Sequence, residues 1–192
     1  MIPPGDITGC ILAGGRATRM GGLLKPLLVV DGATILERQR AVLAPRVGEL
    51  VIALAGPGLL AEHGLRAVFD VVADAGPLAG MAAGLRASAR PWLLVVAGDM
   101  PSIAGGVLDL LRAHATPEAD AVVPWVGGFP EPLLALYGRG AAPAIERRLA
   151  AGQRSVQGAL GDLRVARVDE PALREVDAEL ASFRNLNRPE QL

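Results

Sequence analysis

The chain has 192 residues, of which 51% are hydrophobic, and this suffices for one buried core. Its net charge of −1 argues against a basic surface for nucleic acid. Glycine, proline or charge breaks every apolar run well before a membrane span, and residues 1–5 lack the features of a signal peptide. The single cysteine, Cys10, excludes an internal disulfide framework, so we expect one soluble domain over residues 1–192 in a reducing cytoplasm, without a membrane or nucleic-acid partner.

The first predicted element is an apolar strand from Ile7 to Leu12, in which Cys10 is interpreted as core rather than as a nucleophile. The stretch that follows, LAGGRATRMGGLLKP over residues 12–26, contains four glycines that can turn backbone N–H groups around phosphates. Arg19 and Lys25 supply positive charge, and Lys25 is the only lysine among 19 basic residues. A lysine kept where arginine is otherwise used suggests a place beside a triphosphate. The stretch has neither the Walker A spacing nor the GxGxxG fingerprint.

Beyond this stretch, apolar strands alternate with helical patterns. The alternation predicts a three-layer α/β/α, Rossmann-like fold with a mostly parallel central sheet. Thr34, after an Asp31-Gly32 turn, is the predicted N-cap of the first helix. The further predicted strands span residues 50–54, 67–72, 92–97, 121–125, 133–137 and 165–168. The predicted helices span residues 35–43, 59–63, 81–89, 103–114 and 141–151, before a weakly patterned tail to residue 192.

Three polar stretches follow predicted strands: the loop over residues 14–25, residues 70–80, and Asp99. Ligands of open α/β sheets lie beyond the carboxyl ends of the strands, so we expect these stretches to converge on one site. Asp99 follows a fully apolar strand and suits a hard cation such as Mg²⁺, although an aspartate there can also begin a turn. Asp70, with Asp74 as the alternative, can accept hydrogen bonds from a base or ribose.

Two further features are candidates for ligand contacts. Gly76, in Gly-Pro-Leu-Ala-Gly at the start of a predicted helix, can present backbone N–H groups to a nucleotide; the alternative is tight helix–sheet packing. Asn185 and Asn187 are the only asparagines, and on an extended segment their side chains point the same way. They are predicted to face a polar ligand, the alternative being a pair of Asx turns.

Taken together, these motifs resemble those of the molybdenum cofactor guanylyltransferases over nearly the whole chain. The matching segments are LAGG (12–15) with RMGG (19–22) and Lys25, GPLAGM (76–81), Asp99 before a proline, EPLLALY (131–137), AGQRS (151–155) and NLNRPE (185–190). The resemblance implies that GTP contacts Leu12, Ala13, Gly14, Gly15, Lys25, Asp70 and Asp99, that Asp99 also holds Mg²⁺, and that the pterin phosphate faces Arg154, Asn185 and Asn187.

The implied reaction is transfer of GMP from GTP to the phosphate of molybdopterin, with Lys25, Arg19 and Asp99 as catalytic groups and Mg²⁺ as cofactor. The implied partners are these two substrates, with transient contacts to other proteins of molybdenum cofactor synthesis. Leu24 before Lys25 departs from the family, and GDMP over residues 98–101 resembles the related cytidylyltransferases. A CTP-dependent enzyme, or one with another small phosphate as acceptor, is therefore the alternative. A non-catalytic nucleotide-binding module is a more remote alternative.

Overall fold

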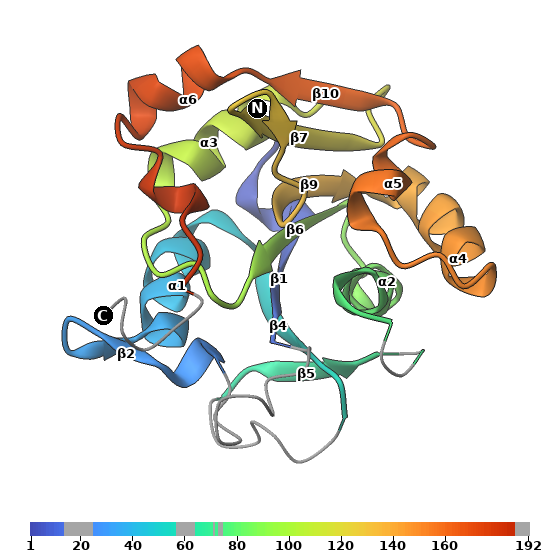
Figure 1. Cartoon of the computed structure of the whole chain (residues 1–192), viewed down its shortest axis with the longest axis horizontal. Helices are drawn as coiled ribbons and strands as arrows, with labels where there is room; N and C mark the ends of the chain where they lie inside the picture. The colour runs from blue at the N-terminus through green and yellow to red at the C-terminus, as the bar shows by residue number, and fades with distance from the viewer. Residues whose placement is uncertain (14–24, 57–63, 71, 73–74, 187–192) are drawn as a thin grey trace.

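The computed structural model describes residues 1–13, 25–56, 64–70, 72 and 75–186 (Figure 1). Its strands are β1 (Ile7–Leu12), β2 (Val29–Val30), β3 (Ala33–Thr34), β4 (Glu49–Leu54), β5 (Arg66–Phe69), β6 (Trp92–Ala97), β7 (Ala121–Val126), β8 (Phe129–Pro130), β9 (Leu134–Gly138) and β10 (Val165–Val168). Its α-helices are α1 (Ile35–Leu43), α2 (Pro77–Ala87), α3 (Gly105–His114), α4 (Ala142–Ala150), α5 (Val156–Leu160) and α6 (Glu170–Val176).

The central sheet has the strand order β10-β7-β9-β6-β1-β4-β5, with β8 paired to β7. Strand β9 is antiparallel to both of its neighbours, β6 and β7, whereas the other pairings along this order are parallel. The six parallel strands therefore end at one edge of the sheet, which we call the carboxyl edge. The expected mostly parallel sheet is confirmed.

Helices cover both faces of the sheet. Along β6, Leu94 and Val96 pack into a core cluster with α1, α3 and α6, while Leu93 and Val95 pack into a second cluster with α2, α4 and α5. Figure 1 shows the two groups of helices on opposite sides of the strands. The sequence of a strand that is buried on both faces is a continuous run of apolar residues, as it is in β6. The three-layer α/β/α prediction is confirmed.

Helix α1 begins at the predicted cap. The Thr34 hydroxyl accepts a hydrogen bond from the Glu37 backbone N–H at 3.1 Å, and the Glu37 carboxylate accepts one from the Thr34 N–H at 2.8 Å. This reciprocal capping box satisfies two N–H groups that lack partners within the helix. Asp31 and Gly32 make the preceding turn with positive φ angles, so the chain enters the helix through a short hairpin.

Several element bounds differ from the sequence predictions. The strand predicted over residues 67–72 ends at Phe69, and the helix predicted from residue 81 begins at Pro77, because Gly76 adopts a φ of 69° and proline suits the first helical turn. Helices α5 and α6 have no counterpart among the predicted elements. The predicted helix over residues 59–63 lies outside the described residues. Within the described ranges, no helix combines the length and the apolar character needed to cross a membrane.

Candidate active site

The centre of the candidate site is an ion pair between the only lysine and the aspartate that follows β6. Lys25 Nζ donates a hydrogen bond to Asp99 Oδ2 at 2.7 Å, and the two side chains are 33% and 18% exposed. They are 74 positions apart in the sequence, and the fold brings them together at the carboxyl edge. Two of the residues singled out for a polyanion site are thus in direct contact.

Gly98 allows three segments to meet beside this pair. Its backbone N–H donates to Leu12 O at 3.0 Å, which joins the end of β1 to the end of β6. A Cβ atom at this position would lie 2.7 Å from Pro26 Cγ and 2.8 Å from Leu12 O. The absence of a side chain at residue 98 therefore makes room for the proline that follows Lys25.

Gln39, which belongs to none of the motifs found in the sequence, fixes the turn that carries Asp99. Its side chain is buried, and its Nε2 donates to Ala97 O at 2.8 Å and to Met100 O at 3.0 Å, on either side of the aspartate. The available signal was an amide in the apolar stripe of α1, where Ile35, Leu36 and Leu43 are also buried. A buried polar side chain needs hydrogen-bond partners, and here those partners are the carbonyls of the site turn.

The C-terminal segment also reaches Asp99. The Leu186 N–H donates to the Asp99 carbonyl at 2.8 Å, and the Leu186 side chain packs against Leu28 and Ile35. This bond places the exposed Asn185 next to the candidate site. Asn187 lies outside the described residues, so its predicted ligand contact stays a prediction.

Asp70 lies beyond the end of β5, on the other flank of β1. Its Oδ1 atom is buried and has no hydrogen-bond partner within the described part of the chain. Burial raises the pKa of this carboxyl from 3.8 to about 6, because the charged form is poorly solvated. A ligand that donates a hydrogen bond to Oδ1 would remove that cost.

The glycines of the Gly-Pro-Leu-Ala-Gly motif play two structural parts. Gly76 precedes α2 with a positive φ, and Gly80 packs so closely that a Cβ would lie 3.0 Å from Leu12 Cδ2 and 3.5 Å from Asp70 Oδ1. Gly80 thus lets the helix approach the ends of β1 and β5. Tight helix–sheet packing, the alternative interpretation of the motif, accounts for Gly80.

Cys10 is fully buried in β1, and burial, aided by the charge of Asp70, raises the pKa of its thiol to about 12. A thiol with so high a pKa carries almost no thiolate at neutral pH. The structure agrees with the interpretation of Cys10 as core.

Among the remaining candidates, the structure describes Arg154, which lies apart from the Lys25–Asp99 pair. Arg154 is exposed in the turn between α4 and α5, which pack on the opposite layer from α1. The guanidinium of Arg148 shapes this turn by donating to Gln153 Oε1 at 2.9 Å. Four other candidates lie outside the described residues: Gly14, Gly15, Arg19 and Asp74.

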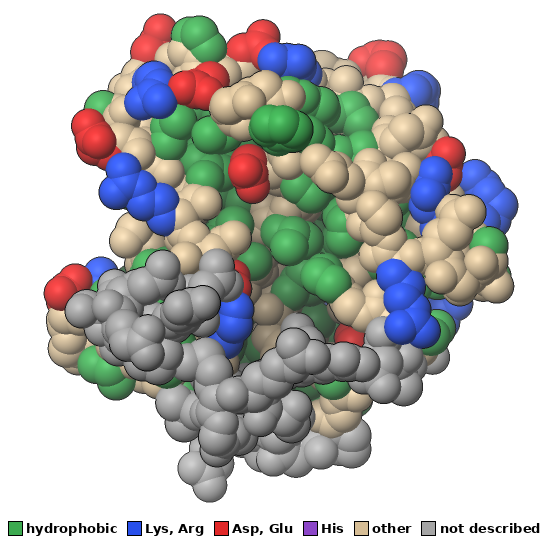
Figure 2. All heavy atoms as spheres, in the orientation of Figure 1, with side chains coloured by type: hydrophobic (Ala, Val, Ile, Leu, Met, Phe, Trp, Pro, Cys, Tyr) green, Lys and Arg blue, Asp and Glu red, His purple; other side chains and the backbone are tan. Residues whose placement is uncertain are grey.

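A further carboxylate, that of Glu131, lies at the carboxyl edge between β8 and β9. The side chain is half-buried, and burial raises the pKa of its carboxyl. In the sequence, Glu131 stands out only as part of the segment EPLLALY over residues 131–137. Figure 2 shows the carboxyl edge, with a hollow lined mainly by hydrophobic side chains near its centre.

A cavity of about 360 Å³ lies at the opposite edge of the sheet, where β6 begins and β9 ends. The two arginines that line it are already bonded. Arg164 donates to both carboxylate oxygens of Asp120, and Arg139 donates to the carbonyls of Ser88 and Arg90. The groups suited to chemistry therefore lie at the carboxyl edge and not at this cavity.

A cation at Asp99 would need ligands from elsewhere. Within the described residues, no group of three or more histidine, cysteine, aspartate or glutamate side chains could hold a metal by itself. A hard cation that takes one carboxylate and several phosphate oxygens is compatible with this donor set.

Comparisons with known proteins identify relatives along the whole chain. Residues 9–166 match the family model described as the MobA-like NTP transferase domain. The chain is 37% identical to a molybdenum cofactor guanylyltransferase of Pseudomonas putida, over all of this chain and 97% of the relative. It is 36% identical to a probable molybdenum cofactor guanylyltransferase of Methanosarcina mazei, over 95% of this chain and 86% of the relative.

Two solved structures have the same fold. Molybdopterin-guanine dinucleotide biosynthesis protein A from Archaeoglobus fulgidus matches with a TM-score of 0.81 and 29% identity, over 95% of this chain and 93% of that one. The 2-C-methyl-D-erythritol 4-phosphate cytidylyltransferase of Thermus thermophilus matches with a TM-score of 0.65 and 22% identity, with the same coverage of both chains. The second likeness concerns the fold alone.

Proposed function

The chain belongs to the MobA-like NTP transferase family and is a nucleotidyltransferase, and from this premise we propose that it transfers GMP from GTP to the terminal phosphate of molybdopterin. The products are the guanine dinucleotide form of the cofactor and pyrophosphate. The observation that carries the proposal is the contact between Lys25 and Asp99 at the carboxyl edge, beside the end of β1. An ammonium group and a carboxylate held together there can bind a polyanion and the cation that accompanies it.

In the proposed reaction, Lys25 exchanges its carboxylate partner for oxygens of the triphosphate when GTP binds. Arg19 and the backbone of residues 12–15 contact the same group, and Asp70 accepts a hydrogen bond from the nucleoside. Gly76 presents N–H groups at the start of α2, while Arg154, Asn185 and Asn187 face the acceptor phosphate. These positive and polar groups lower the barrier by neutralising charge that builds up on phosphate oxygens.

Nucleotidyltransferases of this kind work with a divalent cation, which we propose to be Mg²⁺ held by Asp99. Bound there, the cation would neutralise negative charge on the phosphate oxygens. The carboxylate is free to serve as ligand once Lys25 has turned to the nucleotide.

The bond changes are those of a phosphoryl substitution. A terminal phosphate oxygen of the acceptor attacks the α-phosphorus of GTP in line, a new P–O–P bond forms, and the bond to pyrophosphate breaks. The attacking phosphate is already ionised near neutral pH, so no general base is needed. The protein aligns the two reacting phosphates and supplies positive charge to their oxygens.

Residues 1–192 form one catalytic domain, which one continuous sheet with helices on both faces supports. The compartment is the reducing cytoplasm, which a single buried cysteine supports. Proteins that deliver or receive the cofactor contact the chain transiently.

A test of the proposal is release of pyrophosphate by the purified chain with molybdopterin, Mg²⁺ and each of the four NTPs in turn. We expect release with GTP that requires both acceptor and metal. The local likeness of residues 98–101 to cytidylyltransferases makes CTP the informative comparison. Faster release with CTP would overturn the choice of base, and no release with any nucleotide would refute the activity.

A further inference from the structure

The sheet topology divides the carboxyl edge into two halves. The residues proposed to hold GTP follow β1 and β5, whereas β9, β7 and β10 form the other half, with β6 and Asp99 between them. An in-line reaction requires the acceptor to approach the α-phosphorus from the side opposite the leaving pyrophosphate. With GTP over the first half, the second half is the part of the carboxyl edge left for the acceptor.

Glu131 lies in the second half and is tied to the catalytic turn by backbone hydrogen bonds. Its N–H donates to Pro124 O at 2.9 Å, which anchors it to β7. Two residues later, Leu133 O accepts from the Ala97 N–H at 2.8 Å, two residues before Asp99. The segment that carries Glu131 is therefore fixed against the end of β6.

The carboxylate of Glu131 is half-buried, and its side chain makes no hydrogen bond or ion pair with the described residues. The carboxylate of Glu170 shows the usual arrangement, because it accepts from the Gly127 N–H at 2.7 Å and from Arg174 Nε at 2.9 Å. Withdrawing a carboxylate from water without a partner is unfavourable, so such a group indicates a ligand that donates to it.

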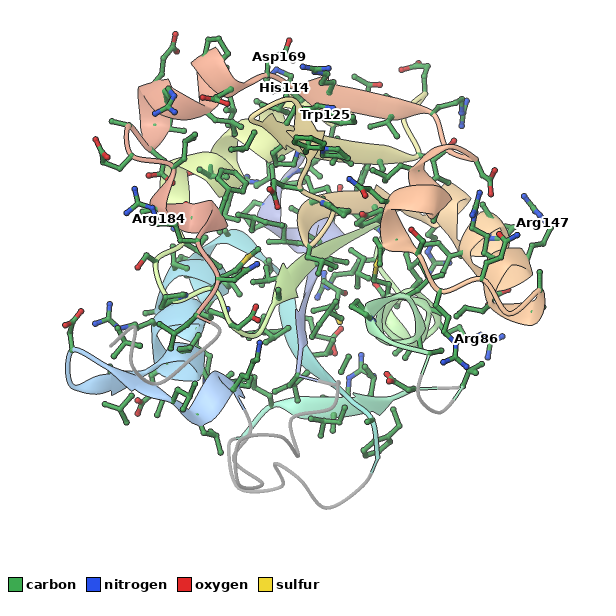
Figure 3. All side chains as sticks on the ribbon, in the orientation of Figure 1. Arg86, His114, Trp125, Arg147, Asp169 and Arg184 are labelled. Atoms are coloured by element: carbon green, nitrogen blue, oxygen red, sulfur yellow. The ribbon has the colours of Figure 1, made fainter. Side chains whose placement is uncertain are left out.

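Two aromatic residues lie on the β7–β8 hairpin that leads into Glu131. The β7–β8 hairpin pairs Trp125 with Pro130 directly before it, and Phe129 at the hairpin is 68% exposed. Arg167 covers one face of the Trp125 ring, 4.9 Å from the ring centroid. Figure 3 shows Trp125 in the part of the molecule that contains β7 and β10, away from α1 and β2.

We propose that Glu131 recognises the pterin ring of the acceptor, with its two carboxylate oxygens accepting hydrogen bonds from the ring N–H and the 2-amino group. This inference rests on the proposed function and identifies the residue that recognises the acceptor. Guanine carries the same pair of adjacent donors, so the shared ligand chemistry is an amino-oxo pyrimidine edge. The position of Glu131 on the half of the edge away from Asp70 assigns it to the pterin rather than to the nucleotide.

The kinetic test compares the wild-type chain with Glu131→Gln, and uses Glu118→Gln as the matched control because Glu118 is exposed at the opposite edge of the sheet. Pyrophosphate release is measured with molybdopterin varied at saturating GTP, and with GTP varied at saturating molybdopterin. We expect Glu131→Gln to raise the KM for the acceptor about 10- to 100-fold, the usual effect of losing hydrogen bonds to a charged group. The KM for GTP should stay within twofold, and the control should change neither.

A binding test does not depend on turnover. Fluorescence titration with 6-hydroxymethylpterin should give a dissociation constant at least tenfold higher for Glu131→Gln than for wild type. The 2-oxo analogue, which lacks the donor amino group, should bind wild type poorly and should bind Glu131→Gln at least as well, because glutamine can donate to the new carbonyl and glutamate cannot.

The outcomes separate this inference from the proposed function. An unchanged acceptor KM in an active Glu131→Gln enzyme would overturn the inference and leave the function intact, and a raised KM for GTP instead would assign the carboxylate to guanine. If the wild-type chain releases no pyrophosphate, the proposed function fails and the pterin titration decides: binding weakened by Glu131→Gln supports the inference, whereas equal or absent binding contradicts it.

Discussion

At the scale of single residues, the Lys25–Asp99 pair matters for chemistry more than for stability. Both side chains keep contact with solvent, and partly exposed ion pairs contribute on the order of 1 kcal/mol or less to folding. A lysine that binds triphosphate oxygens contributes far more to a transition state in which charge redistributes on them. Function and stability can therefore be separated at this position.

We expect Lys25→Ala to lower kcat/KM for GTP about 10²- to 10³-fold, because the cation next to the triphosphate is lost. The melting temperature should change little. Arg86→Ala is the matched control, since Arg86 forms an exposed ion pair with Glu146 at 2.8 Å on the outer face of α2. Steady-state pyrophosphate release and thermal unfolding of both variants provide the measurement, and near-normal turnover of Lys25→Ala would count against the site.

Asp70 gives a pH-dependent prediction. Its pKa is about 6 in the fold against 3.8 in the unfolded chain, so the folded state binds the proton more tightly and loses stability as the pH rises through this interval. In the ligand-free protein, Asp70→Asn should therefore raise the free energy of unfolding by on the order of 1 to 2 kcal/mol at pH 8, a value reduced for solvent screening of this partly exposed side chain, and by almost nothing at about pH 3. Denaturant unfolding at the two pH values measures this difference.

The same substitution should weaken nucleotide binding, because the proposed acceptor of a nucleoside hydrogen bond loses its charge. A variant that is more stable but binds GTP less well is expected where the native residue serves ligand binding at a cost in stability. Equal stability of Asp70→Asn and wild type at pH 8 would show that the buried oxygen has a partner.

At the scale of elements, the turn after β6 depends on a helix from another part of the chain. Gln39 in α1 donates to the carbonyls of Ala97 and Met100, and in this way fixes the backbone on both sides of Asp99. Its Oε1 atom is buried without a partner among the described residues, so the amide is held by these two bonds alone. The arrangement makes Gln39 a positioning residue.

We expect Gln39→Leu to lower stability by on the order of 1 to 3 kcal/mol, since two carbonyls lose their donor. The Mg²⁺ concentration for half-maximal activity should also rise several-fold, because Asp99 is no longer oriented. Ser88→Ala separates the two effects: the buried Ser88 hydroxyl donates to Thr8 Oγ1 at 2.9 Å at the far edge of the sheet. That control should lose stability without a change in metal dependence, and an identical metal response in both variants would argue against positioning.

The elements also show why some features can be read from the sequence and others cannot. Strand β6 was predicted residue for residue, since a strand buried on both faces leaves an unbroken apolar run that Gly98 ends. Helix α5 has only five residues, too few for a helical period to be seen. Gln39 stood out only as one amide in an apolar stripe, and its partners lie 58 and 61 positions away.

At the scale of the whole molecule, the sheet order determines what meets at the site. Lys25, Asp99 and Leu186 come from distant parts of the chain and converge because β1 and β6 are neighbours and the C-terminal segment returns to the same edge. The position of both stretches after predicted strands predicted that Lys25 and Asp99 would lie at one site, and the structure adds their direct contact. Motif spacing could not predict that Glu131 would come to the same edge, because that follows from the antiparallel insertion of β9 between β6 and β7.

This convergence leads to a prediction about ligand-linked stability. A ligand that binds only the folded state at 100 times its dissociation constant adds about 2.7 kcal/mol, which corresponds to roughly 5 to 10 °C in a domain of this size. We expect GTP with Mg²⁺ to raise the melting temperature by this amount, and a chelator to remove most of the increase, because the triphosphate and Asp99 would share the cation. In Asp99→Asn the increase with GTP should be small and insensitive to the chelator.

The control for this measurement is Asp120→Asn at the opposite edge, where Asp120 accepts from Arg164 at 2.8 and 2.9 Å. Loss of that paired contact should lower the melting temperature of the free protein yet leave the increase with GTP and Mg²⁺ unchanged, since the two edges of the sheet are separated by the length of its strands. A chelator-sensitive increase of wild-type size in Asp99→Asn would instead show that the cation has another ligand and is not bound by the turn after β6.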